Sequence, residues 1–193
     1  FEDEWGRSLD PNKGLTVVEI MNAINKGEIK GMYVMGENPA MSDPDQAHAR
    51  AALSVLDHLV VQDIFFTETA WFADVIFPAS AQAEKLGTYT NSNRQVQLGR
   101  PVVDMPGDAR QDWELIVELA VRCGLDWSYK HVSEVYTEMA SHMESLDNIS
   151  WSRLEKESSV CYPSFATDLP GEEIIFFSGF PTSTGKAKIV PTD

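Results

Sequence analysis

Three short apolar runs alternate with helix-type stretches in the first half of the chain. The runs lie at 29–35, 59–65 and 74–78, and their aliphatic and aromatic residues are typical of buried strands. A helix rich in Ala and Leu is predicted at 45–56, and a short one at 67–72. This alternation predicts an α/β fold built on a parallel βαβαβ sheet of the nucleotide-binding, Rossmann-like type, with flanking helices.

Capping residues predict where several helices begin. Thr16 is followed three residues later by Glu19, which is the pattern of a capping box. Asp43 stands directly before a proline and is predicted to be the N-cap of the helix that follows. Asp112 is predicted to be the N-cap of a later amphipathic helix.

The residue pattern in the second half of the chain predicts a pair of strands followed by helices. Strands are expected at 88–90 and 94–97, an amphipathic helix at 132–143, a short helix at 151–154 and a strand at 174–177. We therefore expect three regions: a lead-in with a first helix at 1–28, the α/β domain at 29–128, and a helical connector at 129–193.

The chain is strongly acidic, and this excludes two classes of partner. It has 15 Lys and Arg against 30 Asp and Glu, a formal net charge of −15. Such a charge repels phosphate backbones and anionic lipid, so we expect no nucleic acid partner. No apolar run approaches the roughly 20 residues that span a bilayer, so no membrane insertion is expected. Cys123 and Cys161 form no CxxC pair and are expected to be reduced thiols, as in a cytoplasmic protein.

Polar residues follow the first two predicted strands where a ligand of a parallel sheet would lie. The first strand runs into Gly36, Glu37, Asn38 and Pro39, and the second ends near Gln62 and Asp63. Glycine allows close backbone approach, and an Asn side chain both donates and accepts hydrogen bonds. The alternative is an ordinary turn, because Gly, Asn and Pro are also common turn residues.

Two charged residues extend this candidate site. Lys85 is a cation on a loop beyond the third predicted strand, where it is either an anion ligand or an ordinary surface lysine. Asp112 is either a ligand contact or only a helix cap. The chain contains neither GxGxxG nor a Walker A motif, so neither an ordinary nicotinamide cofactor nor ATP is indicated.

Four ordered blocks resemble the molybdenum bis-molybdopterin-guanine-dinucleotide oxidoreductases, most closely the catalytic α subunit of formate dehydrogenases. The blocks are GMYVMGENPAMSDPD, VVQDIFFTETAWFADVIFPAS, AEKLGTYTNSNRQVQ and RQDWELIVELAVRCGLDW. The closing GKAKIVPTD resembles the family's lead-in to a C-terminal β-barrel domain. One departure is Asn93-Arg94-Gln95, where the family more often has Glu-Arg-Arg.

The resemblance implies a domain that cradles a pterin-guanine dinucleotide. Asn38 in the GENP loop and the pair Gln62–Asp63 would touch one dinucleotide, and Lys85 and Asp112 would also contact the cofactor. Aspartate carboxylates suit the N–H donors of guanine or the hydroxyls of ribose, and a lysine suits phosphate.

The resemblance also implies the activity of a larger enzyme. A complete subunit would oxidise formate to carbon dioxide at molybdenum or tungsten. Electrons would pass through a 4Fe-4S cluster, held N-terminal to this stretch, to other electron-transfer subunits. We therefore expect an internal fragment that is inactive alone. The alternatives are a nitrate reductase, the large subunit of an NADH–quinone reductase, or a non-catalytic α/β binding or assembly module.

Overall fold

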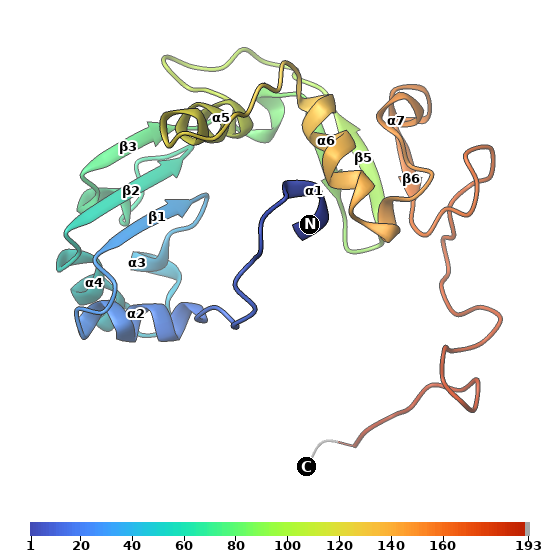
Figure 1. Ribbon diagram of the computed structural model, residues 1–193, viewed down its shortest axis with the longest axis horizontal. Coiled ribbons are helices and arrows are strands. Elements are labelled where there is room, and N and C mark those ends of the chain that lie inside the picture. Colours follow the sequence, from blue (N-terminus) through green and yellow to red (C-terminus); the bar gives the residue numbers. More distant parts are fainter. Residues whose placement is uncertain (192–193) are drawn as a thin grey trace. The chain divides into compact units, whose positions relative to one another are not determined.

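The structure is a computed structural model that describes residues 1–191, and these form two compact units (Figure 1). The first unit comprises residues 1–85 and 100–129. The second comprises residues 86–99 and the described residues from 130 onward. Residues 86–99 therefore group with the second unit, although sequence patterns placed them within 29–128. The reason is strand pairing, because residues 95–97 pair with 159–161.

The first unit is built on a parallel three-stranded sheet, as predicted. Its strands are β1 (Gly31–Met35), β2 (His58–Asp63) and β3 (Val75–Pro78), in the order β1-β2-β3. Met35 is aligned with Gln62, so the first two strands reach the same edge of the sheet. The helical elements of this unit are α1 (Glu2–Trp5), α2 (Val17–Asn25), α3 (Pro39–Ser42), α4 (Gln46–Ser54), η1 (Ala70–Phe72), η2 (Gln82–Glu84) and α5 (Asp112–Arg122).

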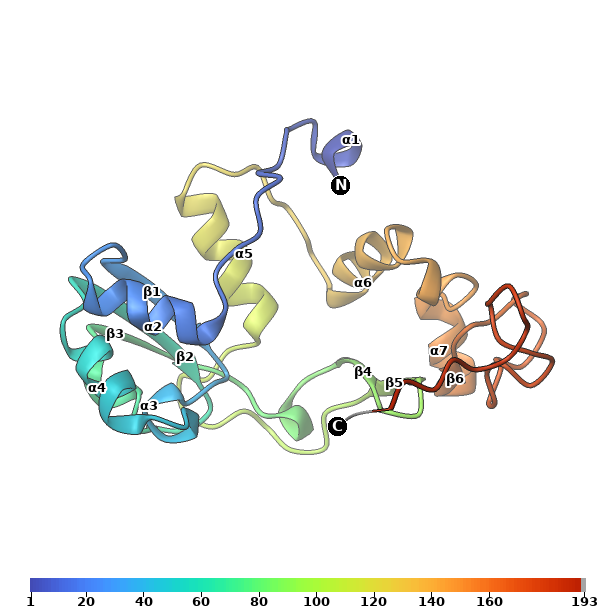
Figure 2. The same cartoon turned by 90° about the horizontal axis from the view of Figure 1, so that it is seen from below.

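The two faces of this sheet carry different residues because side chains alternate along each strand. Val34, Leu59 and Val61 lie on one face and pack with residues of α3 and α4 in a buried apolar cluster. Helix α2 packs on α4 through a second cluster. Helix α5 lies on the side of the sheet away from α2 and α4 (Figure 2), and Tyr33 and Gln62 belong to that face. The sheet thus separates an apolar layer from a layer with polar side chains.

One capping prediction is confirmed and two are wrong. Thr16 and Glu19 form the predicted capping box, in which the Thr16 amide donates to the Glu19 carboxylate at 2.6 Å. Helix α4 has Asp45 as its N-cap, because Asp43 is already the C-cap of the unpredicted helix α3. The N-cap of α5 is Gln111, and Asp112 is the first residue inside the helix.

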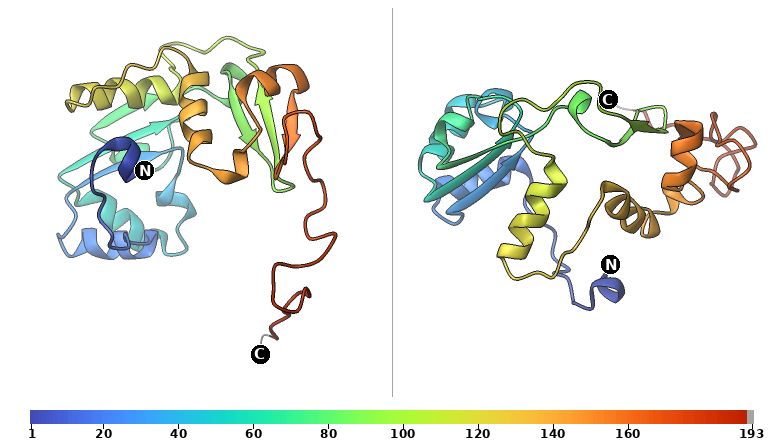
Figure 3. Two further views of the ribbon diagram at one scale, coloured as in Figure 1. Left: turned by 45° about the vertical axis from the view of Figure 1, so that its right-hand side comes forward. Right: turned by 90° about the horizontal axis from the view of Figure 1, so that it is seen from above.

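The second unit is an antiparallel sheet covered by helices (Figure 3). Its strands are β4 (Gly87–Thr90), β5 (Gln95–Gly99) and β6 (Ser159–Cys161), in that order. Val96, Leu98 and Val160 pack with residues of the helical segments, and the buried Tyr136 hydroxyl donates to the Ile149 carbonyl at 2.6 Å. The helical elements are α6 (Val132–Ser141), η3 (Glu144–Leu146) and α7 (Trp151–Glu157).

The C-terminal segment departs from its prediction. The pair β4–β5 and both helices were expected, whereas β6 was not. The strand predicted at 174–177 is wrong, because residues 162–191 contain no helix or strand. Phe177 is 86% exposed there, and Phe176 stacks only on the nearby Phe180, so the apolar run has no strand beside it to pair with. The closing segment GKAKIVPTD, which the notion of a lead-in to a β-barrel domain would make a first strand, forms no strand from residue 185 to residue 191, and its last two residues lie outside the described part.

Arg153 holds this C-terminal segment to α7. Its side chain is only 6% exposed, and its guanidinium donates to four groups outside the helix and one within it. Nη1 donates to the Ser164 hydroxyl at 2.8 Å, and Nη2 to the Leu169 carbonyl at 2.6 Å. The remaining acceptors are the carbonyls of Asn148 and Ala166 and the carboxylate of Glu157.

The variant Arg153→Leu is expected to lower the free energy of unfolding by about 3 kcal/mol, because several buried acceptors lose their donor together. Urea unfolding of the 193-residue chain measures this. Arg122→Leu is the control, since its side chain is 73% exposed in an i,i+4 pair and should change stability by less than about 0.5 kcal/mol. Equal effects of the two variants would contradict the role of Arg153.

Candidate functional site

The GENP loop follows β1 at the edge of the parallel sheet where β2 also ends. Gly36 adopts a left-handed conformation with φ of 61°, which favours glycine, and its N–H donates to the Gln62 carbonyl at 2.9 Å. The Glu37 carboxylate accepts from the Asn38 amide and from the Ser42 hydroxyl. Pro39 is buried at the start of α3. The loop is therefore a fixed turn that leads into a helix.

Asn38 joins the loops after β1 and β2. Its side-chain oxygen accepts from the Thr69 amide at 3.1 Å and the Thr69 hydroxyl at 2.7 Å. Its Nδ2 donates to the Glu68 carboxylate at 2.7 Å. That hydrogen bond lowers the pKa of the Glu68 carboxyl. Most of the hydrogen-bonding capacity of the Asn38 side chain is therefore used to hold these two loops together.

Asp63 stabilises its own loop. Its Oδ1 accepts from the amides of Ile64 at 2.7 Å and Phe65 at 3.2 Å. Its backbone carbonyl accepts from the Ala79 amide at 3.0 Å, which links the ends of β2 and β3. One carboxylate oxygen is thus used locally, and the second is the atom with which Asp63 could meet a ligand.

Gln62 and Asp112 form the centre of a polar cluster. The Gln62 side chain is fully buried, and its Nε2 donates to Asp112 Oδ1 at 2.7 Å. The Tyr33 hydroxyl donates to the Gln62 side-chain oxygen. Both Tyr33 and Gln62 face α5, so the buried amide has a donor on one side and an acceptor on the other. A buried amide needs both kinds of partner.

Lys85 completes this cluster from the segment after η2. Its ammonium donates to Asp112 Oδ2 and, at 2.8 Å, to the carbonyl of Ser80. We call Tyr33, Gln62, Asp112 and Lys85 the Asp112 network. The exposed fractions of the Lys85 and Asp112 side chains are 21% and 32%, so the pair is only partly open to solvent. A carboxylate and an ammonium in such a setting can bind polar groups of both signs.

The structure thus brings three predicted residues together and leaves the others apart. Gln62, Lys85 and Asp112 meet in one network, although they are far apart in the sequence. The GENP loop and Asp63 lie at the same edge of the sheet outside the network, and Gly36 meets it only at the backbone carbonyl of Gln62. Tyr33 was missed, although its position in the strand places it on the same face as Gln62. No sequence signal indicated Ser80.

Burial and charge also affect Tyr33. Burial raises the pKa of its phenol, and the negative charge of Asp112 raises this pKa further. Both causes favour the neutral hydroxyl, which is the form that donates to Gln62. The network therefore keeps a neutral donor beside a charged pair.

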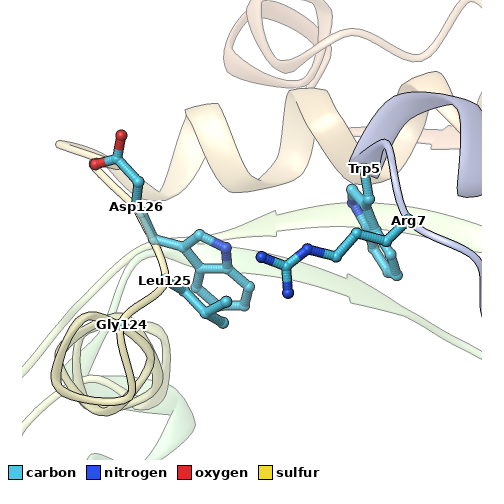
Figure 4. Close-up of a pocket in the computed structure, with 6 residues that line it drawn as sticks. Trp5, Arg7, Gly124, Leu125 and Asp126 are labelled. Atoms are coloured by element: carbon cyan, nitrogen blue, oxygen red, sulfur yellow. The ribbon is translucent and has the colours of Figure 1, made fainter.

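The described residues line cavities in both units, but they contain no metal centre. No group of three His, Cys, Asp or Glu within residues 1–191 could hold a metal ion. A cavity of about 500 Å³ lies along β1 and α2, and its lining includes Tyr33, Glu37 and Pro39. A second cavity of about 530 Å³ is lined by Trp5, Arg7 and residues 124–127 (Figure 4). Of these two, the first borders the GENP loop and the Asp112 network.

A helix that could cross a bilayer is not found in residues 1–191.

Comparison with known proteins identifies relatives of the chain. A family model described as molybdopterin oxidoreductase matches residues 6–122. The α subunit of an F420-dependent formate dehydrogenase from Methanocaldococcus jannaschii is 42% identical over 195 residues. That match covers 100% of this chain and 29% of the relative, so the chain spans less than a third of that protein's length.

A solved structure supports the fold. Acetylene hydratase from Pelobacter acetylenicus matches with a TM-score of 0.64 and 23% sequence identity. The match covers 88% of this chain and 23% of the hydratase chain. At this level of identity the likeness concerns the fold alone.

Tyr33 is expected to release its proton above the usual pKa of about 10. The unfolded chain loses this proton first, so the contribution of Tyr33 to stability is present below pH 10 and is lost as the pH rises further. Asp112→Asn should lower the pKa of Tyr33, because the second cause of the shift is removed, but leave it raised by burial. The pKa of Tyr33 is measured from phenolate absorbance, as the difference between the titrations of a protein with Tyr33 and of its Tyr33→Phe variant.

The difference spectrum is needed because burial also raises the pKa of Tyr136, to about 12. A Tyr33 that titrates together with exposed tyrosines, or that ignores Asp112→Asn, would contradict the Asp112 network.

Proposed function

Because the chain belongs to the molybdopterin oxidoreductase family, we propose that its first unit holds part of the pterin cofactor at the edge of the parallel sheet. Members of this family carry a molybdenum or tungsten pterin cofactor. The observation that supports the proposal most is the Asp112 network, which joins β1, β2, the segment after η2 and α5 at the carboxyl ends of the strands. Ligands of open parallel sheets bind at that edge.

The chemistry of these groups fits a pterin-guanine dinucleotide, the form of cofactor that we propose. Asp112 accepts one bond at each carboxylate oxygen, and a carboxylate has about four acceptor positions, so two remain for N–H or O–H groups. Lys85 uses two of its three donors, and the third remains for an anionic oxygen. Guanine and ribose supply the first kind of group, and pyrophosphate supplies the second.

The beginning of α5 adds to this fit. Its N-cap, Gln111, makes no side-chain capping bond within the described residues. The amides of the first turn of a helix point outward with a partial positive charge, and they receive anionic oxygen readily. The carboxylate of Asp112 stands at the same place, and Lys85 offsets its charge. The edge of the sheet thus tolerates phosphate in a chain of net charge −15.

For the GENP loop and Asp63 we propose supporting contacts. Gly36 brings the backbone to the edge of the sheet, and Glu37, Asn38 and Pro39 set the direction of the loop. Asp63 offers its second carboxylate oxygen. Together with Gln62, Lys85 and Asp112 these residues form the proposed cofactor-binding set.

The activity of the larger protein is proposed from the relative. The Methanocaldococcus jannaschii protein is a formate dehydrogenase subunit, and we infer that the protein of this chain oxidises formate to carbon dioxide. When bound, the cofactor supplies the two-electron chemistry. A 4Fe-4S cluster and further electron-transfer subunits, in a cytoplasmic enzyme, belong to the same proposal. The share of this chain is to bind and orient the cofactor.

In the full-length enzyme, Asp112→Ala and Asp63→Ala should each lower the molybdenum and pterin content after purification. Loss of a charge-assisted hydrogen bond is worth about 1.5–3 kcal/mol, which corresponds to about tenfold to hundredfold weaker retention. Asp57→Ala is the control, because this carboxylate is 70% exposed and lies before the opposite end of β2. Wild-type content in both site variants would contradict their roles as ligand contacts.

Substitution of Lys85 tests the charge separately from the shape. Lys85→Gln keeps most of the side-chain length and removes the charge, so it should lower cofactor retention about tenfold, whereas Lys85→Arg should largely preserve it. Lys30→Gln is the matched control, because Lys30 is 73% exposed in an ion pair with Asp57. Equal cofactor content in all these proteins after gel filtration would show that Lys85 does not contact the cofactor.

A further inference from the structure

Strand β1 forms an open edge of the parallel sheet. In the part of the chain that the structure describes, β1 pairs with β2 alone, whereas β2 lies between β1 and β3 (Figure 1). The other edge is partly closed, because Arg110 forms a bridge with Ala79 directly after β3. The Arg110 N–H donates to the Pro78 carbonyl at 3.1 Å, and its carbonyl accepts from the Ser80 amide at 2.9 Å. The two edges of this sheet are therefore not equivalent.

The backbone of β1 offers hydrogen-bonding groups on its open side. The Lys30 carbonyl accepts from the His58 amide at 3.2 Å, and the Gly36 N–H donates to the Gln62 carbonyl at 2.9 Å. Backbone groups of successive residues point to opposite sides of a parallel strand, so the even-numbered residues from 30 to 36 face β2. The residues whose N–H and C=O groups face away from β2 are then Gly31, Tyr33 and Met35.

The sequence of β1 is typical of an interior strand. GMYVM is an almost continuous apolar run, as in parallel strands that are covered on all sides. Edge strands usually carry a lysine, a proline or a bulge that prevents pairing with a further strand, and β1 has none of these. Yet Tyr33 is 37% and Met35 is 50% exposed. The strand thus has the composition of an interior position and the exposure of an edge.

A groove beside β1 has room for a further strand. Its volume is about 500 Å³, and it is lined by α2, β1 and the segment 37–44. Val17 and Val18, in the first turn of α2, contribute to the lining and are 60% and 62% exposed. The charged residues of the described lining are Glu37 and Asp43. The groove therefore matches an extended apolar segment that is neutral or basic where it passes these two carboxylates.

We propose that β1 is an interior strand in the full-length protein, where a segment of the same polypeptide outside these 193 residues lies in the groove and extends the sheet. The match to the Methanocaldococcus jannaschii relative covers 29% of that protein, so a polypeptide of that size has enough chain to supply the segment. A segment of the same polypeptide also has a high effective concentration at the groove. A second copy fits less well, because each copy carries a net charge of −15 and the same acidic groove.

Amide hydrogen exchange in the full-length protein, read at single residues, tests the pairing. The amides of Tyr33 and Met35 should exchange about a hundredfold or more slowly than those of an unstructured chain, because they donate to the added strand. The Val34 amide is the internal control, since it faces β2 and is protected whether or not the groove is filled. Protection of Val34 without protection of Tyr33 and Met35 would overturn the proposal.

The conditions of this measurement identify what fills the groove. A segment of the same polypeptide protects Tyr33 and Met35 at every protein concentration and also in enzyme prepared without cofactor. If only these two amides lose protection, loss on dilution would indicate a second copy and loss without cofactor would indicate the cofactor. Either result would overturn the proposal, and the second would leave the proposed function standing.

A photoreactive amino acid in place of Val18 identifies the segment directly. In the full-length protein it should cross-link, within one polypeptide, to a residue outside the 193 residues of this chain. A cross-link between two polypeptides, or to a residue within these 193, would contradict the proposed occupant.

Val18→Glu tests the apolar side of the groove. On an open surface a glutamate in the first turn of a helix is favourable, so hydrogen exchange would not change. Beneath an added strand the carboxylate is buried, and the protection of Tyr33 and Met35 should fall about tenfold while that of Val34 is kept. Val55→Glu is the control, because Val55 is 59% exposed at the end of α4 and does not line the groove. Wild-type exchange in Val18→Glu would show that nothing covers this side of β1.

Discussion

The buried amide of Gln62 is the constraint on which the first unit depends. A fully buried side chain that must both donate and accept cannot be satisfied by the apolar residues around a sheet. Tyr33 supplies the donor from the neighbouring strand, and Asp112 supplies the acceptor from α5. Asp112 then needs a cation, and Lys85 provides it. One buried polar group on β2 thus joins three other segments in a fixed arrangement at the edge where ligands of such sheets bind.

Electrostatics explains why this arrangement suits a phosphate-bearing cofactor. The chain as a whole repels anions, since its acidic residues outnumber the basic ones twofold. At the edge of the sheet the balance is different, because Lys85 offsets Asp112 and the first amides of α5 face outward. An anionic ligand is therefore expected to bind at this edge and not elsewhere on the chain, because only there do specific donors replace its hydration shell.

Much of the fold could be predicted from local patterns, whereas the site depends on long-range contacts. The parallel sheet follows from apolar runs, and the capping box of Thr16 and Glu19 from two side chains. Asp112 was misassigned as a cap because the sequence does not show that Gln62 and Lys85 would occupy its carboxylate. The strand at 174–177 failed because an apolar run forms a strand only beside a partner. Ser80 could not be found, because its backbone carbonyl meets Lys85 only in the folded chain.

The pairing of β5 on both sides has a consequence for the order in which the chain folds during synthesis. Residues 87–90 supply one neighbour of β5 at once, whereas the other, at 159–161, leaves the ribosome only after α5 and α6. Until then one edge of β5 presents unpaired backbone groups, and such edges invite association between nascent chains. The first unit closes earlier, once α5 delivers Asp112. Slow translation between residues 99 and 159 would thus prolong the exposure of this edge of β5. Chaperones would then be needed mainly to cover that edge.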